Sequence, residues 1–273
     1  MSQTIRIPVN LTNPGQFFAC CGLLELAARL WPGSVAAFDP GGFMIEAPDR
    51  TAALDALLRA FLQAKLEIGD ETHDDAEDDS SDEGGLASPM WLGPPFNLTL
   101  DWWTEKTLKP WAGSMNAGLI FRAMREAIDV SSLDPLNDRR VVRDPIDPAS
   151  PRRKPEKREP FYFDSLRGGN AKSLDIGFAP DAFSMTSAAC PAVESLSLVG
   201  LQRFRPMPAG LPRVFVYRAW NVALPPSTAA AAACGVLAAA KGEQFRFQNA
   251  FRTDQRKHKG FLPATRVTEG DTP

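Results

Sequence analysis

The sequence predicts an α+β fold, in which a mixed antiparallel sheet packs with helices and carries one acidic disordered insert. Strand-like and helix-like segments follow one another without strict β–α alternation or an internal repeat. Hydrophobic residues make up 44% of the 273 residues and charged residues 23%, the balance of an ordinary globular protein. A chain of this length forms one large or two small domains and buries a core without disulfides.

The first helix has the clearest signal. Asn13 stands where an N-cap is expected, Pro14 at the first helical position and Gln16 at the third. The segment that follows is apolar on nearly all sides until Pro32 and Gly33 end it. We therefore expect this helix to be buried on most sides.

The other elements follow from the spacing of apolar residues and from the turn residues between them. Helical periodicity predicts helices at 51–66, 114–128, 191–203 and 227–240, and Gly242 ends the last of them. Alternating or β-prone runs predict a hairpin at 35–46 and strands at 4–9, 96–103, 161–164, 173–178, 213–223 and 244–248. A proline-rich loop without apolar periodicity occupies 132–160, and loops of this length are usually functional or disordered.

Acidic residues are concentrated in one segment of the chain. Residues 67–83 hold ten acidic residues and no Lys or Arg. The Ser- and Gly-rich segment around them cannot bury enough apolar surface to order itself. We therefore expect an N-terminal α/β part at 1–66, an acidic disordered linker or loop at 67–89, a main α+β part with basic loops at 90–266, and a tail at 267–273.

Basic residues gather in two segments. Residues 139–172 hold ten Lys or Arg against five acidic residues, and residues 246–266 hold six against one. Such clusters indicate a polyanionic partner, although solvated loops have the same composition. The candidate nucleic-acid-binding residues are Arg139, Arg140, Arg143, Arg152, Arg153, Lys154, Lys157, Arg158, Arg167, Gly168, Gly169, Asn170, Lys172, Arg252, Arg256, Lys257 and Lys259.

A glycine pair inside the first cluster is the sharpest candidate. Gly168 and Gly169 lie between Arg167 and Lys172. Paired glycines let the backbone approach a ligand closely, and Asn170 adds both a donor and an acceptor. A plain hairpin turn is the alternative interpretation.

No pattern for catalysis, metal or cofactor binding stands out. His73 lies in the acidic run, and His258 lies among cations that favour its neutral form. No zinc spacing, phosphate-binding loop or nucleophile elbow occurs, and none of the four cysteines forms a CxxC pair. We expect no catalytic residue, metal ligand or cofactor. The start of the chain lacks a signal-peptide pattern and no long apolar stretch occurs, so we expect a cytoplasmic protein with no membrane partner.

Four blocks of sequence carry a resemblance to a known family. They are NPGQFFACCGLLELAARLWPG at 13–33, FDSLRGGNAKSLDIGF at 163–178, PAVESLSLVGLQRFRP at 191–206 and FRTDQRKHKGF at 251–261. These blocks resemble the Csb-type large subunit of type I-U, or I-G, CRISPR systems, a reduced Cas-eight-like protein. The resemblance covers most of the chain except the acidic segment.

The resemblance implies a role in antiviral defence. Large subunits of this kind belong to a Cascade-like complex, where they contact guide RNA and the other effector subunits. They recognise a short motif beside the double-stranded DNA target, the PAM, and a helicase-nuclease joins later. Base pairing reads the target sequence, while the protein reads the short motif and the backbone. Gly168, Gly169, Asn170 and Lys172 are the positions that match the motif-reading loop, and the chain is short for a large subunit.

Two other functions fit the sequence. The first is a guide-RNA-processing or guide-end-binding subunit, an RNA endonuclease in which His258 would be the residue to test. The second is a scaffold that contacts only protein, whose basic segments meet acidic partners. A metal-independent cut in repeat RNA would identify the first. Absence of nucleic-acid binding at two salt concentrations would identify the second.

Overall fold

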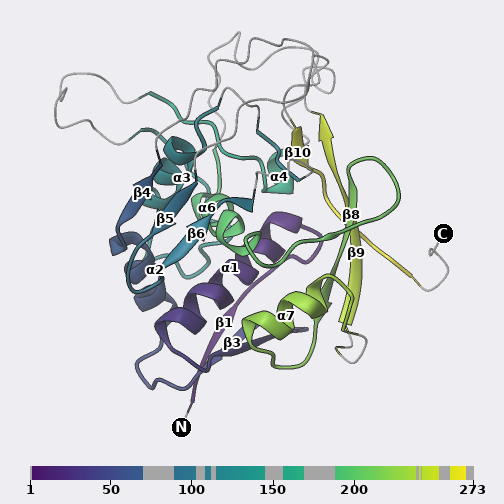
Figure 1. Cartoon of the computed structure of the whole chain (residues 1–273), viewed down its shortest axis with the longest axis horizontal. Coiled ribbons are helices and arrows are strands. Elements are labelled where there is room, and N and C mark those ends of the chain that lie inside the picture. Colours follow the sequence, from purple (N-terminus) through teal and green to yellow (C-terminus); the bar gives the residue numbers. More distant parts are fainter. Residues whose placement is uncertain are drawn as a thin grey trace.

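Two helices run through the centre of the protein, and three antiparallel sheets lie around them (Figure 1). The helices are α1 (Pro14–Leu30) and α6 (Pro191–Gly200). The predicted α+β class is confirmed. The computed structural model describes residues 2–69, 89–102, 108–111, 115–144, 156–168, 188–237, 240, 242–251 and 259–268.

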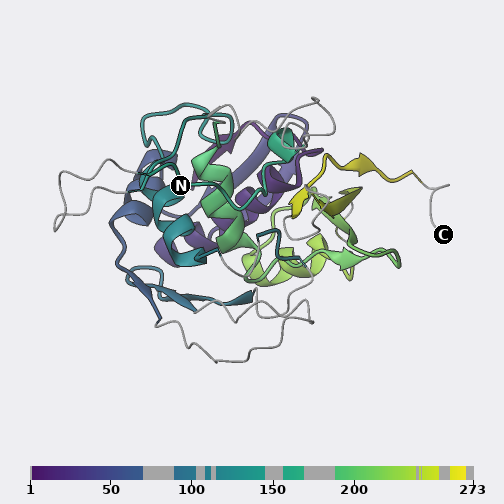
Figure 2. The same ribbon diagram turned by 90° about the horizontal axis from the view of Figure 1, so that it is seen from above.

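The three sheets differ in size. The first has the order β1 (Gln3–Ile7), β3 (Gly42–Ala47), β2 (Val35–Asp39). The second has the order β10 (Lys259–Phe261), β9 (Gly242–Phe251), β8 (Val214–Trp220), β7 (Met207–Pro208), and β11 (Thr265–Arg266) also pairs with β9. The third has the order β4 (Leu66–Ile68), β5 (Met90–Leu92), β6 (Leu98–Leu100). Seen from above, the second sheet lies to the right of the central helices and the third below and to the left (Figure 2).

Four more helices complete the described structure, and they are α2 (Leu54–Gln63), α3 (Ala117–Glu126), α4 (Ser165–Gly168) and α7 (Pro226–Ala233). The start of α1 follows the sequence signal, because the Asn13 side chain accepts a hydrogen bond from the Gly15 amide at 3.1 Å. The residues of α1 from Pro14 to Ala27 are buried, as its apolar composition predicts.

The two central helices approach each other very closely. A Cβ atom on Gly22 of α1 would lie 2.1 Å from the Leu196 carbonyl oxygen, and one on Gly200 of α6 would lie 2.1 Å from the Phe18 carbonyl oxygen. No side chain fits at either position without moving the backbone. The Ser197 hydroxyl adds a hydrogen bond to the Gly15 carbonyl oxygen at 2.7 Å.

Residues from both sides of the acidic segment share one hydrophobic core. Phe17 of α1 stacks on Tyr217 of β8 with ring centroids 4.3 Å apart. The Trp220 indole N–H donates to the Ala36 carbonyl oxygen of β2 at 2.7 Å. The N-terminal part (1–66) and the main part (90–266) therefore contribute to the same core.

One predicted element is wrong, and another is shorter than predicted. Residues 161–164 form no strand; Tyr162 has a φ of +71°, and the chain passes directly into α4, so that Gly168 ends a short helix instead of a strand-flanked turn. The Ala-rich helix ends at Ala233, well before Gly242, because the chain turns at Gly235 with a φ of +77°.

The predicted acidic linker starts too early. Glu67 and Ile68 belong to β4, which pairs with β5 on the far side of the acidic run, and Gly69 donates to the Pro89 carbonyl oxygen at 3.0 Å. The acidic residues at 70–88 and the predicted strand at 173–178 lie outside the described residues.

Candidate nucleic-acid interface

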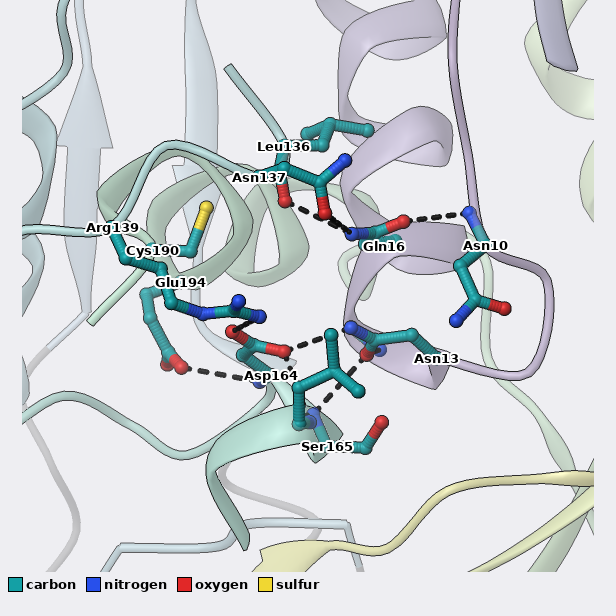
Figure 3. A network of polar contacts seen from close by, with 12 residues as sticks. Asn10, Asn13, Gln16, Leu136, Asn137, Arg139, Asp164, Ser165, Cys190 and Glu194 are labelled. Carbon is teal, nitrogen blue, oxygen red and sulfur yellow. Dashed lines mark hydrogen bonds and ion pairs between the residues drawn. The ribbon is translucent and has the colours of Figure 1, made fainter. Parts of the chain in front are cut away.

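A buried polar network lies at the N-terminal end of α1 (Figure 3). Asn13 uses both ends of its amide there. Its Nδ2 donates to Asp164 Oδ1 at 2.8 Å, and its Oδ1 accepts from the Ser165 amide at 3.1 Å. The cap of α1 therefore also fixes the start of α4, which is 152 residues further along the chain.

The Asp164 carboxylate is the centre of this network. Its side chain is 1% exposed, and Arg139 Nη2 lies 3.0 Å from Oδ2. The buried Glu194 carboxylate of α6 accepts hydrogen bonds from the amides of Phe163, at 3.2 Å, and Asp164, at 3.1 Å. Segment 163–166 is therefore held between α1, α6 and Arg139.

Gln16 holds the proline-rich loop (132–160) against the N-terminal end of α1. Its Oε1 accepts from the Asn10 amide at 2.7 Å, and its Nε2 donates to the Leu136 carbonyl oxygen at 3.0 Å and to Asn137 Oδ1 at 2.9 Å. The Cys190 thiol donates to the Pro135 carbonyl oxygen at 3.3 Å. Burial raises the pKa of this thiol to about 12, so it stays protonated and able to donate.

Backbone hydrogen bonds close the base of the Arg-rich segment. Arg140 and Ala189 exchange two of them, both 2.9 Å long. Arg143 stands opposite Lys157 in an isolated antiparallel bridge. Between these points lie Arg152, Arg153 and Lys154, which are outside the described residues.

Four of the predicted cations of this segment contact carboxylates of the same chain. Besides the Arg139–Asp164 pair, Lys157 lies 2.8 Å from Glu159. Arg158 contacts both oxygens of Asp144, at 2.5 and 2.6 Å, and Arg140 pairs with Asp138 and Asp129. Part of the positive charge counted in the sequence is therefore neutralised within the fold.

The structure brings the two basic segments together. The Phe261 amide of β10 donates to the Tyr162 carbonyl oxygen at 3.0 Å, just before α4. The rings of Phe163 and Phe261 pack with centroids 5.3 Å apart. Figure 1 shows α4 beside β10, so described parts of segments 139–172 and 246–266 lie next to each other.

The remaining predicted site residues are only partly described. Lys259 is the first residue of β10, and Arg167 and Gly168 belong to the backbone of α4. The others lie outside the described residues, and they are Gly169, Asn170, Lys172, Arg252, Arg256 and Lys257. His258, the residue relevant to an endonuclease, lies outside them as well.

Sequence reasoning missed a group of aromatic and basic residues beside β10. The guanidinium carbon of Arg213 lies 4.4 Å from the centroid of the Phe251 ring, and Lys259 Nζ lies 5.8 Å from the same centroid. Lys109 Nζ lies 5.4 Å from the centroid of Trp111. No local pattern signals Arg213, because the Phe251 ring that it meets lies 38 residues further along the chain.

The described part of the chain holds no group of three or more His, Cys, Asp or Glu side chains placed to bind a metal ion. Among the helices in that part, none combines the length and the apolar character needed to span a bilayer. In comparisons with known proteins, the chain matches no protein-family model, no curated protein and no solved structure.

Proposed function

We propose that this chain is a non-catalytic nucleic-acid-binding subunit of a type I CRISPR effector complex. In this role it contacts guide RNA and recognises the motif beside the DNA target. The observation that carries the proposal is the junction of the two basic segments, where the Phe261 amide donates to the Tyr162 carbonyl oxygen at 3.0 Å. Two basic clusters on one side of a protein attract a polyanion more strongly than either does alone.

The buried network supports this function by fixing that junction. Asn13, Asp164 and Glu194 together hold the segment that leads into α4. A rigid support matters for recognition, since loosely held binding residues lose contacts when the partner arrives. The residues just beyond α4, including Asn170 and Lys172, carry the proposed reading of the motif.

Purification of the full chain from its native host tests the proposal. We expect guide RNA and other effector subunits to co-purify, and we expect the complex to bind target duplexes. On duplex DNA, the logarithm of affinity should fall with the logarithm of salt concentration by roughly 0.9 per phosphate contact. A chain that co-purifies without RNA and binds neither RNA nor DNA at low salt would contradict the proposal.

The motif-reading part has its own test. Asn170→Ala and Lys172→Ala should each reduce discrimination between targets with and without the motif by roughly 1–3 kcal/mol per good base contact. Binding of guide RNA should persist in both variants. Unchanged discrimination in both would place the reading residues elsewhere, and the Arg-rich segment 139–158 would be examined next.

The protein-only scaffold is a second candidate because of one observation. Arg139, Arg140 and Arg158 contact carboxylates of this chain, so these three cations already have anionic partners. The same binding experiments separate the two functions, since a scaffold binds partner subunits without binding nucleic acid.

A further inference from the structure

Two cations lie close to the Phe251 ring at the end of β9. The guanidinium carbon of Arg213 is 4.4 Å from the ring centroid, and Lys259 Nζ is 5.8 Å from it. Both distances are within the range of cation–π attraction. All three residues are half-buried, so each side chain retains some exposed surface.

The sheet explains how these side chains meet. Lys259 is directly opposite Phe251 in the antiparallel pairing of β10 with β9. Arg213 precedes β8, and its carbonyl oxygen accepts from the Asn249 amide at 2.9 Å, which extends the β8–β9 ladder by one step. Arg213 has a φ of +58°, a left-handed conformation that is uncommon for a residue other than glycine.

A neighbouring segment adds a second aromatic residue and a third cation. The Lys259 amide donates to the Pro110 carbonyl oxygen at 2.8 Å, and Asn249 Nδ2 donates to the Leu108 carbonyl oxygen at 3.2 Å. These bonds hold Lys109 and Trp111 beside the end of the second sheet. Lys109 Nζ lies 5.4 Å from the centroid of the Trp111 ring. The Trp111 ring is itself buried and packs on Phe161, so it supports this end of the second sheet from the inside.

Arg213 differs from the arginines of the Arg-rich segment. Within the ranges that the structure describes, its guanidinium contacts a ring and no carboxylate, and its buried Nε atom has no hydrogen-bond partner. A guanidinium that is not paired with a carboxylate can still donate its terminal N–H groups to phosphate and offer a planar face for stacking. Nucleic-acid bases stack on aromatic rings and on arginine planes in this way.

We propose that Arg213 and Phe251, with Lys259 beside them, form a stacking site for bases of single-stranded nucleic acid. The site rests on the proposed function, because it specifies where such a subunit holds single-stranded nucleic acid. A single strand fits better than a duplex, since paired bases are stacked on one another and do not offer a free face. Arg213 and Lys259 would contact the adjoining phosphates.

Binding of labelled 20-nucleotide RNA, DNA of the same sequence and the corresponding duplex to the full chain tests the site. Arg213→Ala and Phe251→Leu should each weaken single-strand binding about fivefold or more, as loss of one base stack does. Duplex binding should change less than twofold in Phe251→Leu. Arg50→Ala is the matched control, because Arg50 is exposed between β3 and α2 and its loss changes the net charge equally.

Arg213→Lys separates stacking from charge. Lysine keeps the positive charge but has no planar group, so this variant should lose most of the affinity that Arg213→Ala loses. Full affinity in Arg213→Lys would mean that only charge matters, and the stacking site would be wrong. Thermal melting of each variant checks that it folds.

A measurement on the unchanged protein covers variants that do not fold. RNA carrying a photoreactive uridine should crosslink to the peptide that contains Phe251 or Arg213, and mass spectrometry identifies that peptide. If the protein binds RNA but crosslinks only elsewhere, or if all folded variants bind as the wild type does, the site is wrong and the proposed function stands. If the wild type binds none of the three nucleic acids, the proposed function fails and the site fails with it.

Discussion

Two groups of cations in this protein have different surroundings. Arg139 and Arg158 contact carboxylates of their own chain, Asp164 and Asp144 respectively. Arg213 contacts an aromatic ring and, among the described residues, no carboxylate. A count of charges along the sequence treats these arginines alike. The structure indicates that the first group holds the fold together, whereas Arg213 is the cation that we propose contacts an external anion.

The largest expected effect tests the internal group. Asp164→Ala removes the acceptor of Asn13 and Leu166 and the partner of Arg139. We expect a loss of about 3 kcal/mol in the free energy of unfolding, because a buried charged network is broken. Denaturant titration measures this loss.

Asp164→Asn is the control for that change. Its side-chain oxygen can still accept from Asn13 and Leu166, but an NH2 group replaces the oxygen that accepts from Arg139, so the ion pair and its hydrogen bond are lost. We expect it to be less than half as destabilising as Asp164→Ala. Equal losses in the two variants would mean that the contact with Arg139, not the hydrogen bonds from Asn13 and Leu166, dominates the network.

A smaller effect comes from the buried Glu25, a second carboxylate that holds internal cations. Arg29 Nε lies 2.8 Å and Arg203 Nε 2.7 Å from its carboxylate oxygens. Burial alone would raise the pKa of Glu25, but the hydrogen bonds and charges of Arg203 and Arg29 outweigh burial and hold the pKa below its ordinary value of 4.5.

The sign of the pH dependence follows from that lowered pKa. The contribution of Glu25 is fully present above its unfolded pKa of 4.5 and is lost as pH falls through the lower folded value. Glu25→Gln should cost about 2 kcal/mol at neutral pH and should reduce the fall in stability below pH 4.5. Parallel stability curves for the two proteins from pH 3 to pH 7 would contradict this assignment.

A still smaller loss of stability is expected when Arg158, a cation of the ion-paired group, is replaced. Arg158→Ala should cost about 0.5–1 kcal/mol of stability, because its ion pair with Asp144 is only partly buried. The variant should leave the salt dependence of nucleic-acid binding unchanged, since Arg158 already has an anionic partner. Arg213→Ala should instead reduce the slope on single strands by roughly 0.7.

The smallest effect on stability is expected from the acidic segment. Replacing residues 71–87 with a short turn should change the melting temperature by no more than a few degrees, because β4 and β5 already pair across it and a shorter loop closes at lower entropic cost. Non-specific nucleic-acid binding should tighten, since the net charge of the chain becomes more positive. A large drop in melting temperature would show that the segment supports the fold.

Local signals in the sequence were sufficient for some elements. Asn13, Pro14 and the apolar run after them define α1, because capping and burial depend on residues close in the chain. The third sheet was only partly predicted, since β4 and β5 are three residues long and lie on either side of the acidic run. Short strands of this kind are specified by their partners more than by their own residues.

The site was less predictable than the fold. Aromatic residues at 161–163 favour a strand locally, but the Glu194 side chain takes the place of a neighbouring strand by accepting from the Phe163 and Asp164 amides. The pairing of Arg139 with Asp164 and of Arg213 with Phe251 depends on tertiary contacts. Counting Lys and Arg along the sequence was enough to find the basic clusters. Whether each cation contacts a carboxylate or an aromatic ring could not be predicted in this way.

The tight crossing of α1 and α6 at Gly22 and Gly200 has a consequence for synthesis of the protein on the ribosome. The first helix leaves the ribosome long before its partner, since α1 ends at Leu30 and α6 begins at Pro191. At roughly 5–20 residues per second, the apolar surface of α1 waits about 10–30 s for α6. During that interval the nascent chain exposes the surface that chaperones bind, so depletion of ribosome-associated chaperones should reduce its yield more than that of a protein whose first helix packs locally.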